Sequence, residues 1–347
     1  MRLHPTFIAL FPIAGLFGCA AVQDESPDAM PVQEPAPAEV ANPMASFARM
    51  VSGEWRVTFA NGTSQFDTWH WGPGEHSMRA LTESSNADGT STSGVCRVLY
   101  WHPGRKEIVL LGLFSRCRLA QGTVKIDGEV VDFNSDFHDL GLPGLRRELS
   151  LRWAFDGPDK YRATLNEATA AAPGFLAEWD YVRSRPPVAT RPRTGEETSK
   201  PSERLKALEA LVGHTWEARG DWATGDAFHI QSTFEWIPYV DATYARAFAL
   251  TQDGEPTHLL DAYIYDHTGT DALHCLALSN WGGVYEGDLT VLEGGALQLD
   301  LKGYEGDQVV PHVVRFDFEQ DGTLRDRVWS LEGTGPTLML DVHHKKL

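Results

Sequence analysis

Four arginines in strand-like segments are the residues of this sequence best placed to bind a ligand. They recur in pairs in the two halves of the chain: Arg79 with Arg246, and Arg162 with Arg327. Arg79 alternates in step with Leu81, and Arg246 with Phe248, which predicts that these arginines face an apolar interior. A guanidinium there would hold a ligand carboxylate through two parallel hydrogen bonds. The alternative is a structural arginine that stacks on a tryptophan or bonds backbone carbonyls.

Tryptophans stand in the same kind of segment. FDTWHW brings Trp69 and Trp71 to one face of a strand, and HIQSTFEW brings Trp236 to the corresponding place in the second half. Together with the four arginines, they would line a pocket for a small apolar ligand. The alternative is that aromatic side chains fill the interior, because a barrel of few strands encloses little space.

No familiar catalytic signature is present. The sequence lacks G-x-S-x-G, H-E-x-x-H, P-loop and G-x-G-x-x-G motifs, and its 13 histidines show no metal-ligand spacing. Asp136, His138 and Asp139 in NSDFHDLG would suit a metal or acid–base site, but their place at a strand exit favours a solvated loop. An enzyme of unknown reaction would need a buried carboxylate, and the nearest strand candidate, Glu235, points outward by its alternation. We expect no catalytic residue, no metal and no cofactor.

Most of the chain shows the period of two that is typical of half-buried antiparallel strands. Turn sequences such as HPGRK, IDGE and DHTGTD separate these strands at short intervals. The pattern predicts an all-β fold in which a meander closes as a barrel or packs as a sandwich.

The two halves of the chain resemble each other. A constant offset of 165 residues relates aromatic and turn positions: Trp71 and Trp236, Tyr100 and Tyr265, His102 and His267, Gly104 and Gly269, Gly122 and Gly287, Asp156 and Asp321. We interpret the halves as a tandem duplication whose surfaces have diverged.

Each half opens with a short helix-like segment, followed by a glycine and then a tryptophan. The pairs are Gly53 with Trp55 in MVSGEW, and Gly213 with Trp216 in LVGHTW. We expect a structural role, in which the glycine ends the helix and the tryptophan plugs the floor of a barrel.

Charge divides the chain further. Residues 45–183 carry 15 basic and 17 acidic side chains, whereas residues 207–347 carry 8 and 23. The acidic second half argues against nucleic acid as a partner. A Pro-rich, charged linker at 184–204 separates the expected barrels at 45–183 and 205–347.

The N-terminus predicts export and membrane anchoring. Residues 1–18 have the length and apolar run of a signal peptide, and LFGC at its end resembles a bacterial lipobox. This resemblance implies lipid attachment at Cys19 and a place in the bacterial cell envelope, with the outer membrane favoured over the inner. The acidic, Pro-rich composition that follows predicts a solvated tether over 19–44. A secreted protein without the lipid is the alternative. In an oxidising envelope Cys96 and Cys117 can pair as a disulfide, or both can be buried thiols.

The helix, the G-x-W or G-x-x-W opening and the meander of each half resemble the calycin group: lipocalins, fatty-acid-binding proteins and nitrobindin-like domains. SFARMVSGEW, CRVLYWHPGRKEIVL and AEWDYVRS are similar to a bacterial calycin-like family of unknown function. The resemblance implies two tandem up-and-down β-barrels, each preceded by a short helix, and an interior arginine that binds a ligand carboxylate.

Three functions remain open after this resemblance. The leading hypothesis is a lipid-anchored envelope protein that binds a small apolar ligand without catalysis. An envelope lipoprotein with filled barrels, of structural or partner-binding role and unknown protein partner, is the alternative. The third function is haem binding or an enzyme reaction of unknown kind. Nitrobindin-like domains use a histidine near the chain end as the haem ligand, and His343 or His344 would take that role here. The alternative for both histidines is an exposed basic tail.

Overall fold

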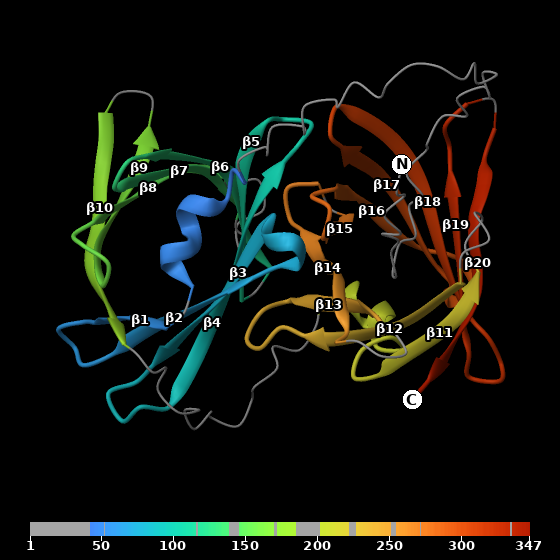
Figure 1. Ribbon diagram of the computed structural model, residues 1–347. Helices are drawn as coiled ribbons and strands as arrows, with labels where there is room; N and C mark the ends of the chain where they lie inside the picture. Colours follow the sequence, from blue (N-terminus) through green and yellow to red (C-terminus); the bar gives the residue numbers. More distant parts are fainter. Residues whose placement is uncertain are drawn as a thin grey trace, which may run out of the picture.

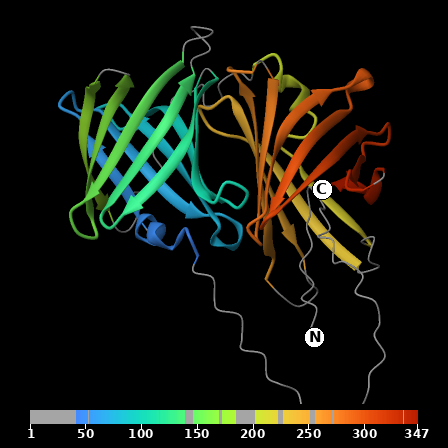
Figure 2. The ribbon, with the colours of Figure 1, turned by 90° about the horizontal axis from the view of Figure 1, so that it is seen from above.

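The computed structural model describes residues 42–51, 53–115, 117–138, 146–169, 172–184, 202–221, 227–250, 255–270, 272–333 and 335–347. Nearly all regular structure in them is β, in two closed antiparallel barrels of ten strands each that stand side by side (Figures 1 and 2). This confirms the expected all-β fold with tandem barrels. None of the helices in these ranges is long and apolar enough to span a membrane. Cys19 and residues 1–18 lie outside the described residues.

Barrel 1 is a meander in which each strand pairs with the next and β1 closes the ring with β10. Its strands are β1 (Glu54–Thr58), β2 (Ser64–Trp71), β3 (Ser77–Ser85), β4 (Ser91–His102), β5 (Glu107–Phe114), β6 (Arg118–Asp127), β7 (Val130–His138), β8 (Arg146–Phe155), β9 (Lys160–Thr169) and β10 (Ala172–Ser184). A 3₁₀ turn, η2 (Pro73–Glu75), joins β2 to β3.

Barrel 2 repeats this topology and closes between β11 and β20. Its strands are β11 (Thr215–Asp221), β12 (Ala227–Trp236), β13 (Ala242–Ala249), β14 (Thr257–His267), β15 (Ala272–Ser279), β16 (Val284–Val291), β17 (Leu297–Glu305), β18 (Gln308–Phe318), β19 (Leu324–Ser330) and β20 (Thr337–Lys346). The turn η4 (Glu293–Gly295) lies between β16 and β17.

A short 3₁₀ helix precedes each barrel: η1 (Ala45–Met50) and η3 (Leu205–Leu208). The opening tryptophans are buried, and each indole N–H donates to a carbonyl of the segment before it. Trp55 donates to Met50 at 3.1 Å, and Trp216 donates to Leu211 at 3.2 Å. The Arg183 guanidinium stacks 4.3 Å above the Trp55 ring. An arginine therefore does cap an opening tryptophan, although it is none of the four that the sequence singles out.

The glycines before these tryptophans occupy backbone conformations that other residues adopt rarely. Gly53 has φ +138° and Gly213 has φ +78°. Each therefore allows the chain to turn from the 3₁₀ segment into the first strand.

Large side chains pack the interior of both barrels. In barrel 1, Trp69 meets Trp153 edge to face at 5.8 Å, and Trp55 meets Tyr161 at 4.9 Å. The core of barrel 2 is mainly aliphatic and includes the aromatic side chains of Trp216 and Phe234. In both barrels the inward side chains therefore pack against one another and fill the interior.

The two barrels share a third apolar core, which lies between them. It is formed by outward-facing residues of β4, β5 and β6 and of β13, β14, β15 and β16, with the turn before β13 (Figure 1). Leu111, Leu113 and Leu119 come from barrel 1, and Leu276 and Leu278 come from barrel 2; each is at most 3% exposed. Burial of this kind makes the contact a fixed part of the fold rather than a loose domain contact.

The contact between the barrels is pseudo-symmetric. The offset of 165 residues relates members of its two sides: Val98 and Tyr263, Tyr100 and Tyr265, Leu111 and Leu276, Leu113 and Leu278, Leu119 and Val284. Each barrel thus presents the same surface to the other, which is the arrangement of a twofold symmetric dimer within one chain.

Candidate functional site

The structure places all four predicted arginines on the outside of the barrels. Arg246 pairs with Glu235, Arg162 with Asp180 and Arg327 with Asp317, at 3.1, 2.9 and 2.5 Å. The Arg79 guanidinium stacks 3.8 Å above the Tyr244 ring of the other barrel. The predicted interior placement of Arg79 and Arg246 was therefore wrong.

Strand alternation explains this correction. The inward residues next to Arg79 are Met78 and Ala80, both fully buried in the core of barrel 1. Leu81, whose alternation suggested an interior, packs instead against the core between the barrels. Strand pairing also changes the correspondence between the halves. Ser77 lies opposite Tyr100, and Ala242 lies opposite its counterpart Tyr265, so Ser77 corresponds to Ala242. Two residues further on, Arg79 therefore corresponds to Tyr244 rather than to Arg246.

The three predicted tryptophans do face the interiors. Trp69 is 1% exposed in the core of barrel 1, and Trp71 and Trp236 are half-buried against the cores of barrels 1 and 2. All three pack against the cores that occupy the two interiors.

Arg97, which sequence reasoning missed, lies in the interior of barrel 1. Its Nη2 lies 2.6 Å from Asp67 Oδ2 and 2.6 Å from Thr82 Oγ1. Barrel 2 has Ser232 and Ala262 at the positions of Asp67 and Arg97. The Asp67–Arg97 pair therefore occurs only in barrel 1. The signal in the sequence was the alternation of Arg97 with the buried Leu99, which indicates that both side chains face the interior.

The interior of barrel 2 contains a different polar pair, Asp326 and His344. Their Oδ2 and Nε2 atoms are 3.5 Å apart, and the side chains are 1% and 3% exposed. Burial raises the pKa of Asp326 although His344 opposes the shift. His344 thus lies in the core rather than in an exposed tail, whereas His343 is 51% exposed beside Glu319.

Haem does not fit these two histidines. A haem ligand needs an imidazole at the edge of an apolar space. Leu324, the cross-strand partner of His344, and Val342, its neighbour on the same face, belong to the packed core of barrel 2. His343 faces outward.

The cysteines of the described residues are free thiols. Cys96, Cys117 and Cys275 are all buried, so the pairing of Cys96 with Cys117 is not formed. Cys96 lies opposite Leu113 in the β4–β5 pair, whereas Cys117 lies beyond the end of β5. Burial raises the pKa of both thiols to about 12, which leaves them protonated and unreactive at neutral pH.

Asp136 and His138, the two described residues of the acid–base cluster that NSDFHDLG suggested, make separate contacts. Asp136 pairs with Arg146 at 2.8 Å on the outside of barrel 1, and Asp139 lies outside the described residues. His138 lies instead near His267 of barrel 2, with ring centroids 5.8 Å apart. Within the described ranges, no group of three or more histidine, cysteine or acidic side chains could hold a metal ion.

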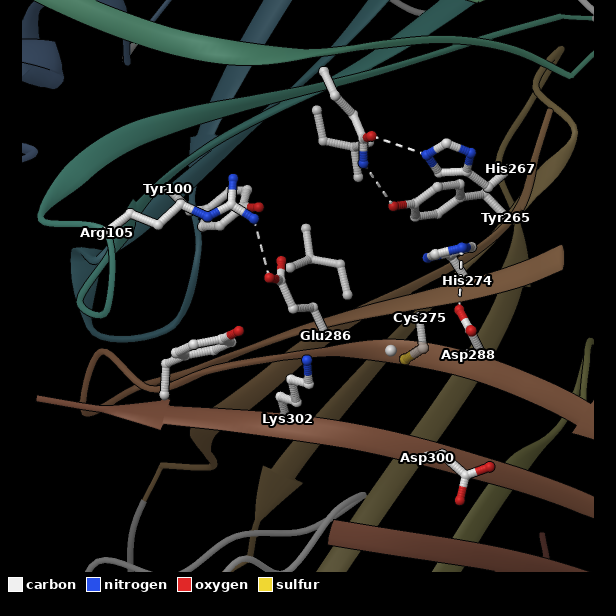
Figure 3. A pocket seen from close by; sticks show the side chains of 15 residues that line it. Tyr100, Arg105, Tyr265, His267, His274, Cys275, Glu286, Asp288, Asp300 and Lys302 are labelled. Atoms are coloured by element: carbon white, nitrogen blue, oxygen red, sulfur yellow. Dashed lines mark hydrogen bonds and ion pairs between the residues drawn. The ribbon is translucent and has the colours of Figure 1, made fainter. Parts of the chain in front are cut away.

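A cleft of about 390 Å³ lies where the barrels meet, and Figure 3 shows the side chains that line it. This volume is in the range of small-molecule sites. We call it the interbarrel cleft. Barrel 2 supplies most of its wall from β14 to β17, and barrel 1 contributes Tyr100, Arg105, Leu111 and Gln121.

A chain of hydrogen bonds crosses the contact beside this cleft. The Gly269 N–H donates to Nδ1 of His267 at 3.1 Å, so the ring proton is on Nε2. Nε2 then donates to Gln121 Oε1 at 3.0 Å, and Gln121 Nε2 donates to the Tyr265 hydroxyl at 3.2 Å (Figure 3). The hydroxyl oxygen of Tyr265 is thus an acceptor, and its proton remains available to the cleft.

In the pseudo-symmetric half of this arrangement, a glutamate replaces the glutamine and an arginine adds a further contact. His102 accepts the Arg105 N–H on Nδ1 at 3.2 Å, as His267 accepts that of Gly269. Its Nε2 lies 3.5 Å from Glu286, the counterpart of Gln121. Arg105 also bonds Glu286, at 3.1 Å. Burial raises the pKa of Glu286, but the His102 and Arg105 interactions prevail and hold it below its ordinary value, so Glu286 is an anion.

The Tyr100 hydroxyl, the counterpart of that of Tyr265, has no hydrogen-bond partner among the described residues. Its side chain lines the cleft and is 4% exposed. Burial, followed by the nearby Glu286, raises its pKa, so the phenol stays protonated. Because the residue lines the cleft, its hydroxyl donor is a candidate contact for a ligand.

The cleft wall of barrel 2 differs from the corresponding surface of barrel 1 in its ionisable groups. The register relates five outward positions of barrel 1 to cleft residues of barrel 2: Val109 to His274, Gln121 to Glu286, Thr123 to Asp288, Asn134 to Asp300, and Asp136 to Lys302. The cleft is thus one of the places where the two halves differ chemically.

One glycine in each barrel allows two neighbouring strands to lie close together. A Cβ on Gly287 would lie 1.9 Å from the backbone oxygen of Asp300, and one on Gly122 would lie 1.9 Å from that of Asn134. The conserved offset between these glycines therefore has a steric cause in both barrels.

The fold and the cleft define a tandem two-barrel protein with a polar site at the seam. Comparison with known proteins adds little to that description. No protein-family model and no curated protein matches the chain. Among solved structures, the one titled "Crystal Structure of Rv2717c from M. tuberculosis" matches with a TM-score of 0.30 and 13% identity, over 42% of this chain and 100% of that one.

Proposed function

We propose that this chain is a non-catalytic binding protein that holds a small polar molecule in the interbarrel cleft. The observation that carries the proposal is a pair of tyrosines, Tyr100 and Tyr265, whose hydroxyl groups each have a proton to donate in a cleft of ligand size. The barrel interiors support a structural role, because packed side chains occupy them. The proposed ligand is polar and lies between the barrels, whereas the sequence suggested an apolar ligand inside a barrel.

Catalysis has less support than binding. An acid or base of this cleft would need a side chain whose proton affinity suits transfer near neutral pH. The phenol of Tyr265 holds its proton too tightly, because burial raises its pKa, whereas the pKa of His267 is lowered to about 4. Both groups suit fixed hydrogen bonding.

Binding can be tested with four small polar probes: glucose, glucosamine, glutarate and cadaverine. We expect at least one of them to bind the full chain at millimolar concentration, measured by calorimetry and thermal unfolding. The variant Asp288→Trp should abolish that binding, because Asp288 lies on the cleft wall with a side chain that is 58% exposed and can be enlarged without disturbing the core.

Glu293→Trp is the matched control, since Glu293 is an exposed residue of η4 on the same barrel and does not line the cleft. Equal binding by the Asp288→Trp variant, or no response of the natural chain to any probe, would contradict the proposal. Binding of palmitate that Asp288→Trp leaves unchanged would favour the barrel interior instead.

We further propose that the protein is a lipid-anchored protein of the bacterial cell envelope, on the outer membrane. The support is the apolar run that ends in LFGC and the acidic, Pro-rich segment after it. In a bacterial host we expect the chain to take up radiolabelled palmitate and to sediment with outer membranes. Cys19→Ala should lose the label and shift the chain away from the membrane fraction; a labelled Cys19→Ala variant would refute the anchor.

A further inference from the structure

One end of the interbarrel cleft has two carboxylates that form no ion pair with a lysine or arginine among the described residues. Asp288 on β16 and Asp300 on β17 lie directly opposite each other in the antiparallel pair. Both side chains point away from the core of barrel 2, since the inward neighbours are Leu289 and Leu299. Like charges at directly opposite positions destabilise a strand pair, so this arrangement favours a bound cation.

The partners of these two carboxylates among the described residues are neutral. Asp288 lies 3.1 Å from Nε2 of His274, and burial lowers the pKa of that histidine. Asp300 accepts only from the Gln298 amide, at 3.1 Å. Neither negative charge thus has a lysine or arginine partner among the described residues, and both residues line the cleft. Figure 3 shows the contact of Asp288 with His274.

The other end of the cleft has the opposite polarity. Arg105 of barrel 1 is bonded to Glu286, and Lys302 is the cross-strand neighbour of Glu286, so two cations accompany one carboxylate there. Tyr100, whose hydroxyl has no hydrogen-bond partner among the described residues, lines the same cleft. This end can donate hydrogen bonds to an oxygen atom of a ligand.

We infer that the ligand of the interbarrel cleft is a small organic ammonium compound that also has a hydrogen-bond-accepting oxygen. The ammonium group binds between Asp288 and Asp300, and the oxygen accepts from Tyr100. This inference rests on the proposed binding function and names the class of ligand. The acidic surface of barrel 2, with 23 acidic against 8 basic side chains over residues 207–347, attracts such a cation from solution.

The sharpest test compares ligands that differ only in the charged group. Glucosamine and glucose share a hydroxylated ring, and only glucosamine has an ammonium group; cadaverine and glutarate share a five-carbon chain of opposite charge. We expect glucosamine to bind the full chain at least tenfold more tightly than glucose, and cadaverine more tightly than glutarate. The preference should weaken as salt is raised, because the carboxylates are partly exposed.

Variants assign the preference to the two carboxylates. In the double variant Asp288→Asn with Asp300→Asn, we expect the affinity for glucosamine to fall to that for glucose, while thermal stability is kept or increased. Tyr100→Phe should weaken glucosamine binding and leave cadaverine binding unchanged, since cadaverine has no oxygen atom. Glu293→Gln, which removes an acidic charge outside the cleft, serves as the control.

The outcomes separate this inference from the proposed function. If glucose or glutarate binds as tightly as its ammonium counterpart and Asp288→Trp abolishes the binding, the cleft is a binding site and the ammonium inference fails. If the double asparagine variant keeps the preference, the ammonium site lies elsewhere and the inference also fails. If none of the four probes binds, both proposals fall.

Discussion

Replacing Arg97 with methionine is expected to lower the free energy of unfolding of barrel 1 by about 3–5 kcal/mol. The guanidinium of Arg97 is the charged partner of Asp67, whose side chain is fully buried, at 2.6 Å. Its removal leaves a carboxylate in the barrel interior with no opposite charge beside it, and that desolvated anion is the source of the loss. Urea unfolding followed by tryptophan fluorescence measures the change.

The double variant Asp67→Leu with Arg97→Met is the informative control. It removes both charges and keeps the interior filled, so most of the lost stability should return. Barrel 2 supports this expectation, because it folds with Ser232 and Ala262 at the corresponding positions. A double variant as unstable as Arg97→Met alone would show that the loss comes from packing rather than from the unpaired charge.

Acidification from pH 6.5 to 4 should destabilise the protein through His267. Burial, and then the neighbouring His274 and His138, lower the pKa of His267 from 6.5 to about 4. The unfolded chain therefore binds this proton first as the pH falls, and stability present above pH 6.5 is lost towards pH 4. After allowance for partial solvent screening, we expect this histidine to account for about 1–2 kcal/mol.

His267→Gln tests the assignment, because glutamine keeps a donor for Gln121 and does not titrate. In thermal unfolding from pH 7 to pH 4, this variant should lose less stability than the natural chain. His343→Gln is the matched control, since His343 is 51% exposed. If the two variants follow the same pH curve, another buried group governs the acid sensitivity; His312, whose pKa burial also lowers to about 4, is the next to test.

Sequence patterns predicted the architecture of this protein well. The period of two, the turn sequences and the offset of 165 residues led to tandem all-β barrels, which the structure confirms. Local chemistry decides such features: alternation reports which residues are buried, and a strand in a meander pairs with its neighbour in sequence. The same offset related Tyr100 to Tyr265 and His102 to His267, which we interpreted as evidence of duplication.

The candidate site was not predictable in the same way. Alternation reports that a face is buried, but not what buries it, so Leu81 suggested an interior for Arg79 when the other barrel covers that face. The cleft joins residues from separate halves, such as Gln121 and Tyr265, whose contact depends on how the barrels dock. The charge difference between the halves was the one signal that pointed to barrel 2.

The pseudo-symmetric contact has a consequence for how this protein could evolve. In a dimer of identical subunits each substitution occurs twice, so a position near the axis cannot be glutamine on one side and glutamate on the other. Joining both copies in one gene lifts that constraint. Gln121 with His267 and Glu286 with His102 are then two versions of one contact, of which one is free to keep the barrels together while the other specialises.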